Sequence, residues 1–279
     1  DVYKRQHELT MTAFVSHFGF EFKSGLRSPT SMLMFYLFPL GFYALMGLVM
    51  VEINPDFAEL LIPSLVLVTL MAGTLLGLPG QLVDAREAGI YRSFKVNGVP
   101  ATSIIAIPLL ASTFHGVIGS AVIALTAGPL FGATIPMDWV SFVLLTVLSA
   151  FTFGSLASLI GVVSTSSRAT VLWSQLVFLP SMLIGGLMLD LELIPEGVRW
   201  FSKLLPTTYS MQAYQGLAFG APTVIDDALS VIVLVAGGIV AASLAIALFS
   251  WDRKNSTRRL HPALAFLAIL PYLAGAFLS

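Results

Sequence analysis

Charge is scarce in this sequence. Only 10% of its 279 residues are Asp, Glu, Lys or Arg, whereas 57% are hydrophobic. Soluble domains carry roughly one-quarter charged residues. A chain this apolar cannot keep its surface in water, so we predict that most of its surroundings are lipid. The net charge of -1 adds little, because the placement of charge in a membrane protein matters more than its sum.

Cysteine is absent, which excludes disulfides, a thiol nucleophile and a cysteine-based metal site. The first thirty residues show no short apolar core before a small-residue cleavage site, so we expect no cleavable signal peptide. The opening DVYKRQ matches no pattern that follows, and we assign it no structural role.

Catalytic and nucleotide-binding motifs are also missing. The four histidines are scattered without metal-ligand spacing, and there is no GxSxG, HExxH or GxxxxGK[ST] motif. We therefore expect no catalytic residue, metal or cofactor in this chain. If ATP powers the protein, ATP and Mg must bind to another chain.

What the sequence does contain is a series of apolar stretches of membrane-spanning length, about 20 residues each. They predict an all-α membrane protein, a polytopic helical bundle forming one domain over residues 1–279. The six core spans are expected at 32–51, 57–78, 103–127, 139–163, 171–189 and 229–249. A shorter run, 262–278, is predicted to be a seventh span; the alternative is a tail lying on the membrane.

Two further segments are too polar or too short to span. In residues 7–27, apolar residues recur at helical spacing, which is typical of a helix lying in the membrane interface. The alternative for 7–27 is a helix packed on the rest of the protein. Between residues 190 and 227, Pro195 and Pro206 favour two short apolar helices, which we expect to be re-entrant or interfacial.

The basic residues support this layout if the N-terminus is cytoplasmic. Twelve of the 14 then fall in predicted inner segments, as the positive-inside tendency requires. The inner basic residues are Lys4, Arg5, Lys23, Arg27, Arg86, Arg92, Lys95, Arg168, Arg253, Lys254, Arg258 and Arg259. The outer loops keep only Arg199 and Lys203, and they are rich in carboxylates.

Titratable side chains are nearly absent from the predicted spans, and His115 is the only one placed deep in a span. Ion-coupled carriers usually need such groups as coupling sites, so their absence weakens that class. We expect His115 to form a hydrogen bond between helices; a proton relay is the alternative. Small-residue pairs such as Gly73 and Gly77 indicate close helix contacts, within the chain or in a dimer.

The charged stretch 84–100, DAREAGIYRSFKVNGVP, stands between two apolar spans and must lie in water. By itself this pattern is also typical of an ordinary basic loop that sets topology. Together with the entry KSGLRSPTSMLMFYLFPLGFYALMG and the later PSMLIGGLMLDLELIPEGVRWFSKLLPTTYSMQAYQGLAFG, it resembles the membrane subunit of an ABC-2 type transporter, a type-V-fold ABC exporter permease. The resemblance covers roughly residues 14–251. Ile90 stands where the family usually has Thr, and the tail after Arg259 exceeds the family's six spans.

The resemblance implies a half-transporter in the plasma membrane of a bacterium or archaeon. Its partners would be a separate ABC ATPase and a second permease, either a homodimer copy or a paralogue. Membrane lipids would surround it, and no nucleic acid is expected. The stretch 84–100 would be the coupling loop that contacts the ATPase, with Gly89 allowing a sharp turn. The contact residues would be the apolar anchors Ile90, Tyr91 and Phe94 and the rim residues Arg86, Glu87, Arg92 and Lys95.

The cargo is open: a drug, lipid, glycan or similar compound. We place a hypothetical outer gate at Trp200, Phe201, Pro206 and Tyr209, in the predicted extracellular helices. Functions from other classes remain as alternatives, namely an ion-coupled secondary carrier or a non-transporting membrane scaffold. A co-purifying ATPase would separate them from a transporter subunit.

Overall fold

The structure is a computed structural model that describes residues 2–251 and 260–279, with side chains described from residue 14 onward. Every regular element in the described ranges is helical. In chain order these are α1 (Val2–Arg27), α2 (Pro29–Met32), η1 (Leu33–Leu37), α3 (Phe38–Ile53), α4 (Phe57–Met71), η2 (Ala72–Gly77), α5 (Leu78–Glu87), α6 (Ile90–Val96), α7 (Ala101–Phe131), α8 (Trp139–Val163), α9 (Ser167–Ile184), η3 (Leu191–Leu193), α10 (Glu196–Ser202), α11 (Pro206–Ala213), η4 (Tyr214–Ala218), α12 (Asp227–Leu248), η5 (Pro262–Ile269) and α13 (Leu270–Leu278). The prediction of an all-α polytopic membrane protein is confirmed.

Within the described residues, five continuous helices are long and apolar enough to cross a membrane: Pro29–Ile53, Phe57–Glu87, Ala101–Phe131, Trp139–Val163 and Asp227–Leu248. They correspond to predicted spans one to four and six. The second is longer than predicted, because α5 continues the helix through Asp84 and Glu87, which we had placed in a loop. The predicted fifth span, α9, is not among the five. Its 18 residues include Arg168, Ser174 and Gln175, which lower its mean hydropathy.

Two spans contain a wide π-helical turn just before a proline. η1 precedes Pro39 in the first, and η2 precedes Pro79 in the second. Proline has no N–H and its ring clashes with the carbonyl four residues earlier. Those carbonyls belong to Phe35 and Leu75, and both lie inside the π turns. The widened turn thus lets each helix continue past its proline.

The helix formed by α4 and η2 is the centre of the bundle, with almost every side chain from Leu61 to Leu75 buried. It packs against α3, α7 and α8. Close approach depends on glycines: Gly73 lies against the Phe35 ring, and Gly154 lies against Leu109. These small-residue sites therefore serve packing within the chain.

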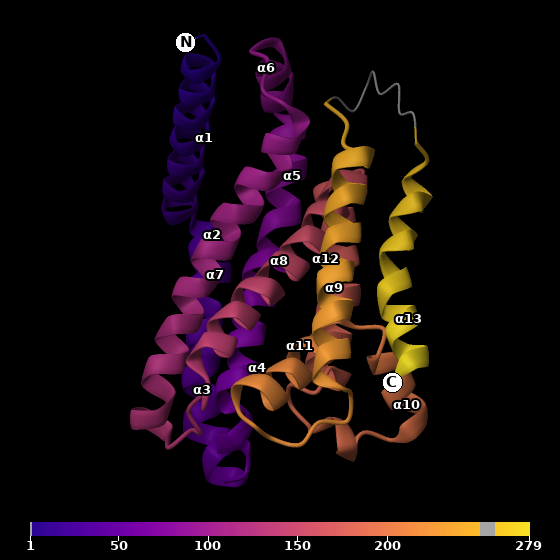
Figure 1. Cartoon of the computed structure of the whole chain (residues 1–279). Helices are drawn as coiled ribbons and strands as arrows, with labels where there is room; N and C mark the ends of the chain where they lie inside the picture. Colours follow the sequence, from indigo (N-terminus) through magenta and orange to yellow (C-terminus); the bar gives the residue numbers. More distant parts are fainter. Residues whose placement is uncertain (1, 252–259) are drawn as a thin grey trace.

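The ends of the helices fall into two groups, shown at opposite ends of the bundle in Figure 1. The N-terminus and α6 lie at one end, and the C-terminus and α10 lie at the other. The α7–α8 connection joins the second group, since the backbone N–H of Met137 donates to the carbonyl of Ala218 at 2.8 Å. The connections between helices thus alternate between the two ends of the bundle, as the predicted layout requires. Four predicted inner basic residues, Arg253, Lys254, Arg258 and Arg259, lie outside the described residues.

Helix α1 packs along α7. The Phe18 ring meets the edge of Phe114, and the Phe22 ring stacks on His115 at 4.3 Å between centroids. This contact agrees with the alternative of a helix packed on protein, while Val15 and Phe20 stay exposed. The location of residues 7–27 in a membrane interface stays a prediction.

The C-terminal segment is a docked part of the bundle. The Tyr272 ring lies directly on Gly237 of α12, and Gly275 lets Val233 and Tyr209 approach α13. The far end reaches α10, where Lys203 Nζ donates to the carbonyl of Ser279 at 2.7 Å. With a 3₁₀-helix followed by an α-helix, these 17 residues extend about 30 Å, which matches the hydrocarbon thickness of a bilayer. An α-helix of that length would fall short, so the 3₁₀ stretch favours the predicted seventh span.

Candidate functional site

The segment from α5 to the start of α7 projects from the bundle at the N-terminal end of the molecule (Figure 1). Helix α5 ends at Glu87, and Gly89 turns the chain with φ +75° before α6 begins at Ile90. Gly98 repeats the turn with φ +75°. A Cβ at either glycine would meet nothing within 4 Å, so glycine is needed here for its backbone conformation rather than for space. The positive φ at Gly89 agrees with the role predicted for a glycine here, and a sharp change of direction at this residue stays a prediction.

We had predicted Arg86 to be a rim residue of the coupling surface, and this prediction is wrong. Its side chain is buried, and Nη1 donates to the carbonyl of Val162 at 2.9 Å while Nη2 donates to that of Ser164. Both acceptors belong to the C-terminal end of α8, where free carbonyls carry partial negative charge. Arg86 therefore clamps the end of α5 to the end of α8.

A second bond ties the same turn of α5 to the next helix. The Ser167 hydroxyl at the start of α9 donates to Asp84 Oδ1 at 2.7 Å. The end of α5 is thus connected to both helices that flank the short turn after α8.

The predicted role of Tyr91 as an apolar anchor also needs correction. It is only 5% exposed and packs on Phe249 at 5.4 Å between ring centroids, so it cannot serve as an anchor for another protein in this conformation. It fixes α6 to the end of α12 instead. Helical periodicity could show that Tyr91 has an apolar environment, but not which chain supplies it.

The other predicted contact residues lie at the end of α5 (Glu87) and on α6. Glu87, Ile90, Arg92 and Lys95 are exposed, and Phe94 is half-buried beside the His17 ring at 5.4 Å. The most exposed large apolar side chain is one that sequence analysis missed: Val96, at 87%. Its position directly before the Asn-Gly turn was the available indication.

A cavity of about 460 Å³ separates α6 from α1 and is closed by α5 and α7. His17 and Glu21 line it from α1, and Tyr91 lines it from α6. Burial raises the pKa of the Glu21 carboxyl above its usual value, because desolvation penalises the charged form. Burial and the neighbouring Glu21 charge raise the pKa of Tyr91 as well.

We predict that acid strengthens the docking of α1 beside α6. A carboxyl with a raised pKa in the folded state favours folding when protonated, so its contribution is complete below the unfolded pKa and is lost as pH rises through the folded one. Glu21→Gln should remove this dependence. Because the chain lacks cysteine, spin labels at Ser16→Cys and Asn97→Cys can report the α1–α6 distance across pH. An unchanged pH response in Glu21→Gln would contradict this assignment, and His17 could not explain it, because burial lowers the pKa of His17 and acid acting on His17 would weaken the docking.

The predicted gate residues do not form one cluster. Trp200 and Phe201 are exposed neighbours on α10, and Trp200 meets Phe277 of α13 at 6.3 Å. Pro206 begins α11 and is buried, and Tyr209 is fully buried with its hydroxyl donating to the carbonyl of Tyr272 at 3.3 Å. Trp200 and Tyr209 each contact α13, at different places along it. Their role as a gate stays a prediction.

Helix α11 is enclosed by protein, because all eight of its residues are buried. Its predicted re-entrant or interfacial position in the membrane stays a prediction. Sequence analysis missed Gln212, whose side chain supplies hydrogen bonds to backbone in this buried region. Its Oε1 accepts from the backbone N–H of Val224 at 2.6 Å and of Ile225 at 3.1 Å, and its Nε2 donates to Gln215 at 2.8 Å. Irregular backbone inside a membrane protein needs such partners.

His115 has the environment expected of a packing residue. It is 3% exposed, its Nδ1 pairs with the Tyr36 hydroxyl at 2.8 Å, and the rings of Phe22 and Phe35 cover it. The described residues contain no group of three or more His, Asp or Glu side chains that could hold a metal.

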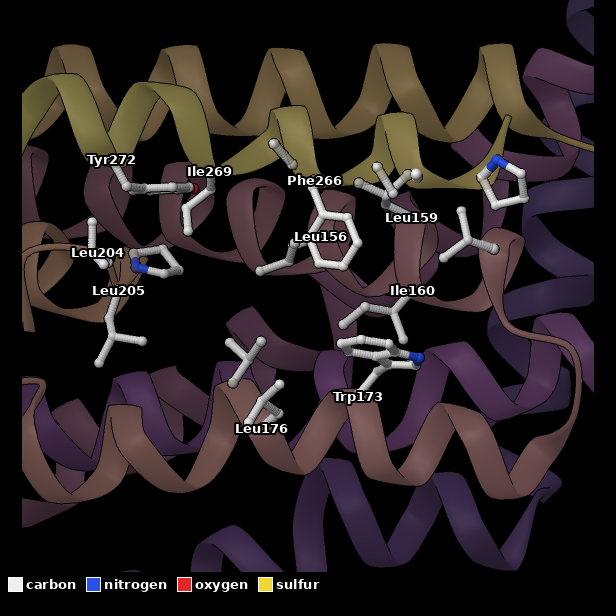
Figure 2. Close-up of a pocket in the computed structure, with 17 residues that line it drawn as sticks. Leu156, Leu159, Ile160, Trp173, Leu176, Leu204, Leu205, Phe266, Ile269 and Tyr272 are labelled. Carbon is white, nitrogen blue, oxygen red and sulfur yellow. The ribbon is translucent and has the colours of Figure 1, made fainter. Parts of the chain in front are cut away.

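Comparison with known families decides the identity. The family model for ABC-2 type transporters matches residues 12–219, from α1 through α6 to η4. The chain belongs to the ABC-2 type transporter family. It is the membrane domain of an ABC transporter, a multi-pass protein that serves as the permease component. No curated protein matches the sequence. The matched range ends before α12 and the C-terminal segment, which lines an apolar groove of about 510 Å³ together with α8 and α9 (Figure 2).

Proposed function

We propose that this ABC-2 permease works in an exporter of the plasma membrane of a bacterium or archaeon, with a cytoplasmic N-terminus. A separate ABC ATPase would bind ATP and Mg and dock on α6. A second permease, identical or paralogous, would complete the pathway between the two membrane subunits. The cargo would be a drug, lipid, glycan or similar compound.

The observation that supports this proposal best is the construction of α6. It is a short projecting helix with positive-φ glycines before and after it, and Ile90 and Val96 are exposed on it. Exposed apolar side chains surrounded by charged ones are typical of the centre and rim of a protein interface. Residues 1–279 contain no phosphate-loop motif, so in this proposal ATP binds to a separate ATPase.

The internal contacts of α5 and α6 explain how force would reach the membrane. Tyr91 holds α6 to Phe249 at the end of α12, and Arg86 holds α5 to the end of α8. Closure of two ATPases would move α6, and these contacts would carry that displacement into α8, α9 and α12. Rigid helices transmit such a displacement because their packed contacts are not continuously deformable.

The alternative of an ion-coupled carrier has less support. Such a carrier needs ionisable groups along its pathway. His115 is enclosed by aromatic rings and is hydrogen-bonded to Tyr36, so it lacks the water access that a relay requires.

The proposal predicts that a charge on the exposed apolar face of α6 weakens ATPase binding. In Val96→Glu and Ile90→Glu, a carboxylate replaces an apolar contact, and we expect the affinity for the ATPase to fall by about tenfold or more. The ATPase encoded beside this permease, or co-purified with it, would be titrated against permease in lipid nanodiscs. Transport-coupled ATP hydrolysis would be measured in the same samples.

The matched control is Thr165→Glu, which adds the same charge to an exposed position in the α8–α9 turn, at the same end of the molecule. It should leave affinity unchanged. Equal affinity for wild type and both α6 variants, with normal membrane insertion, would show that α6 is not the docking site.

A further inference from the structure

The cavity of about 460 Å³ between α1 and α6 lies at the N-terminal end of the molecule (Figure 1). Its volume falls within the usual range of about 300–1,000 Å³ for small-molecule pockets. The residues that line it include the buried Ser31, Leu82 and Tyr91, whereas Phe20 and Ile90 are exposed. A small molecule can therefore enter this cavity from outside and lose much of its water there.

Two carboxylates line the cavity, and neither is neutralised. Glu21, on α1, forms no hydrogen bond or ion pair with the described part of the chain, although burial raises the pKa of its carboxyl. Asp84, at the end of α5, accepts a hydrogen bond from the Ser167 hydroxyl. No Lys or Arg is found among the described residues that line the cavity, since Arg86 points to the carbonyls of α8. A desolvated charge without a partner is costly, so this cavity favours a cation.

The Tyr91 hydroxyl is a second, independent group without a partner. Tyr91 is only 5% exposed and lines the cavity, yet its hydroxyl forms no hydrogen bond with the residues that the structure describes. Buried hydroxyls normally have such a bond, because leaving one unpaired costs free energy. Burial and then the Glu21 charge raise the pKa of Tyr91, which places the two groups near each other. An ammonium group has three N–H donors and can bond to both oxygens at once.

Aromatic rings on both sides of the cavity fit the rest of an organic cation. Phe94 and Tyr91 line it from α6, and His17 and Phe20 line it from α1. The His17 and Phe94 rings meet edge to face with 5.4 Å between centroids. Burial lowers the pKa of His17, which favours the neutral ring and so reduces repulsion of a cation. Aromatic faces attract cations and also bury apolar surface, so an amine with an apolar body suits this cavity better than an inorganic ion.

We propose that this cavity binds an organic ammonium ion, with its charge at Glu21 and the Tyr91 hydroxyl and its apolar body against Phe20 and Phe94. The ligand would contact α1 and α6 at the same time and so hold these two helices together. Because every binding group belongs to this chain, the site does not depend on the ATPase, on a second permease or on the direction of transport.

The test compares two probes with the same ring system. One is 1-naphthylmethylamine, which is protonated at neutral pH, and the other is 1-naphthylmethanol, which is neutral. The full chain in phosphatidylcholine nanodiscs is dialysed against each probe, and naphthalene fluorescence gives the bound amount. Empty nanodiscs give the part that dissolves in lipid. We expect saturable binding of the amine, at least about tenfold tighter than binding of the alcohol, because only the amine supplies a charged donor.

Three variants locate the site. Glu21→Gln should lower the affinity for the amine by about tenfold and leave that for the alcohol unchanged. Tyr91→Phe keeps the ring and removes the hydroxyl, so it should lower the affinity for the amine by about threefold. The matched control is Glu87→Gln, which removes an exposed carboxylate at the end of α5 that does not line the cavity and should change neither affinity.

The melting temperature of each variant shows whether the fold is intact. Neither Glu21→Gln nor Tyr91→Phe should lower it, since each removes a group without a hydrogen-bond partner in the described residues. Equal affinity of the wild type for both probes, or an affinity for the amine that Glu21→Gln leaves unchanged, would overturn the proposal. An equal loss in Glu87→Gln would overturn it too, because the attraction would then come from general surface charge rather than from this cavity.

Discussion

Replacing Arg86 with alanine is expected to separate the motion of α6 from α8. The substitution leaves the carbonyls of Val162 and Ser164 without the buried guanidinium that they now share. Hydrogen bonds to charged groups contribute about 1.5–3 kcal/mol each, so the loss of both predicts a loss of about 3–6 kcal/mol of stability. That corresponds to a melting temperature lower by about 6–24 °C for a domain of this size. Thermal unfolding in detergent and permease-stimulated ATP hydrolysis would be measured together.

Two variants separate the clamp from a general loss of charge. Arg86→Lys keeps the charge but cannot donate to both carbonyls with a planar fork, so it should fall between wild type and Arg86→Ala in both measurements. Arg27→Ala removes an exposed arginine at the same end of the molecule and should behave as wild type. Full coupling in Arg86→Ala despite a lower melting temperature would limit Arg86 to a structural role.

Gly73→Val is expected to have the largest effect on folding. A side chain at this position would occupy the space of the Phe35 ring, in the most deeply buried helix of the bundle. Neither the backbone at Gly73 nor the Phe35 ring can move easily, because Gly73 lies in η2 among fully buried neighbours and Phe35 is 2% exposed. Overpacking of a close-packed interior costs about 1–3 kcal/mol and sometimes more, and here we expect the upper end. The yield of monodisperse protein after detergent extraction and its melting temperature would report the effect.

Gly80→Val is the matched control. It makes the same substitution one to two turns later in the same continuous helix, where a Cβ meets nothing within 4 Å. Valine has a higher helix propensity than glycine, so this variant should be neutral or slightly stabilising. Equal loss in both variants would mean that a valine anywhere in this helix is harmful, so that the Phe35 contact does not control the result.

Apolar length predicted the helices well, because the bilayer imposes a requirement that can be counted along the chain. Predicted span 139–163 coincides with α8, and 262–278 has the bounds of η5 and α13. The second helix was predicted too short for a physical reason. Hydropathy falls at Asp84, but α5 continues because Arg86 and Asp84 find partners on α8 and α9. Those partners are about eighty residues away in sequence.

The roles of individual residues within 84–100 also depend on partners that are distant in sequence. Composition indicated a charged loop with apolar residues in it, and the family resemblance suggested which residues would meet a partner. Only the tertiary contacts distinguish Tyr91, which packs on Phe249, from Val96, which stays exposed. In a seven-residue helix, every apolar side chain looks equally suited to an interface until its neighbours are known.

By itself, the sequence determined that this is an all-α, multi-pass membrane protein without a phosphate-loop motif in residues 1–279, with predicted spans one to four and six in a definite order. Each of these follows from local composition, because transfer to lipid is a property of a segment rather than of its neighbours. The tertiary structure alone decided that Arg86 and Tyr91 face inward, that the small residues serve contacts within the chain, and that the C-terminal segment closes an apolar groove. Those outcomes depend on contacts between residues far apart in sequence, which no local pattern specifies.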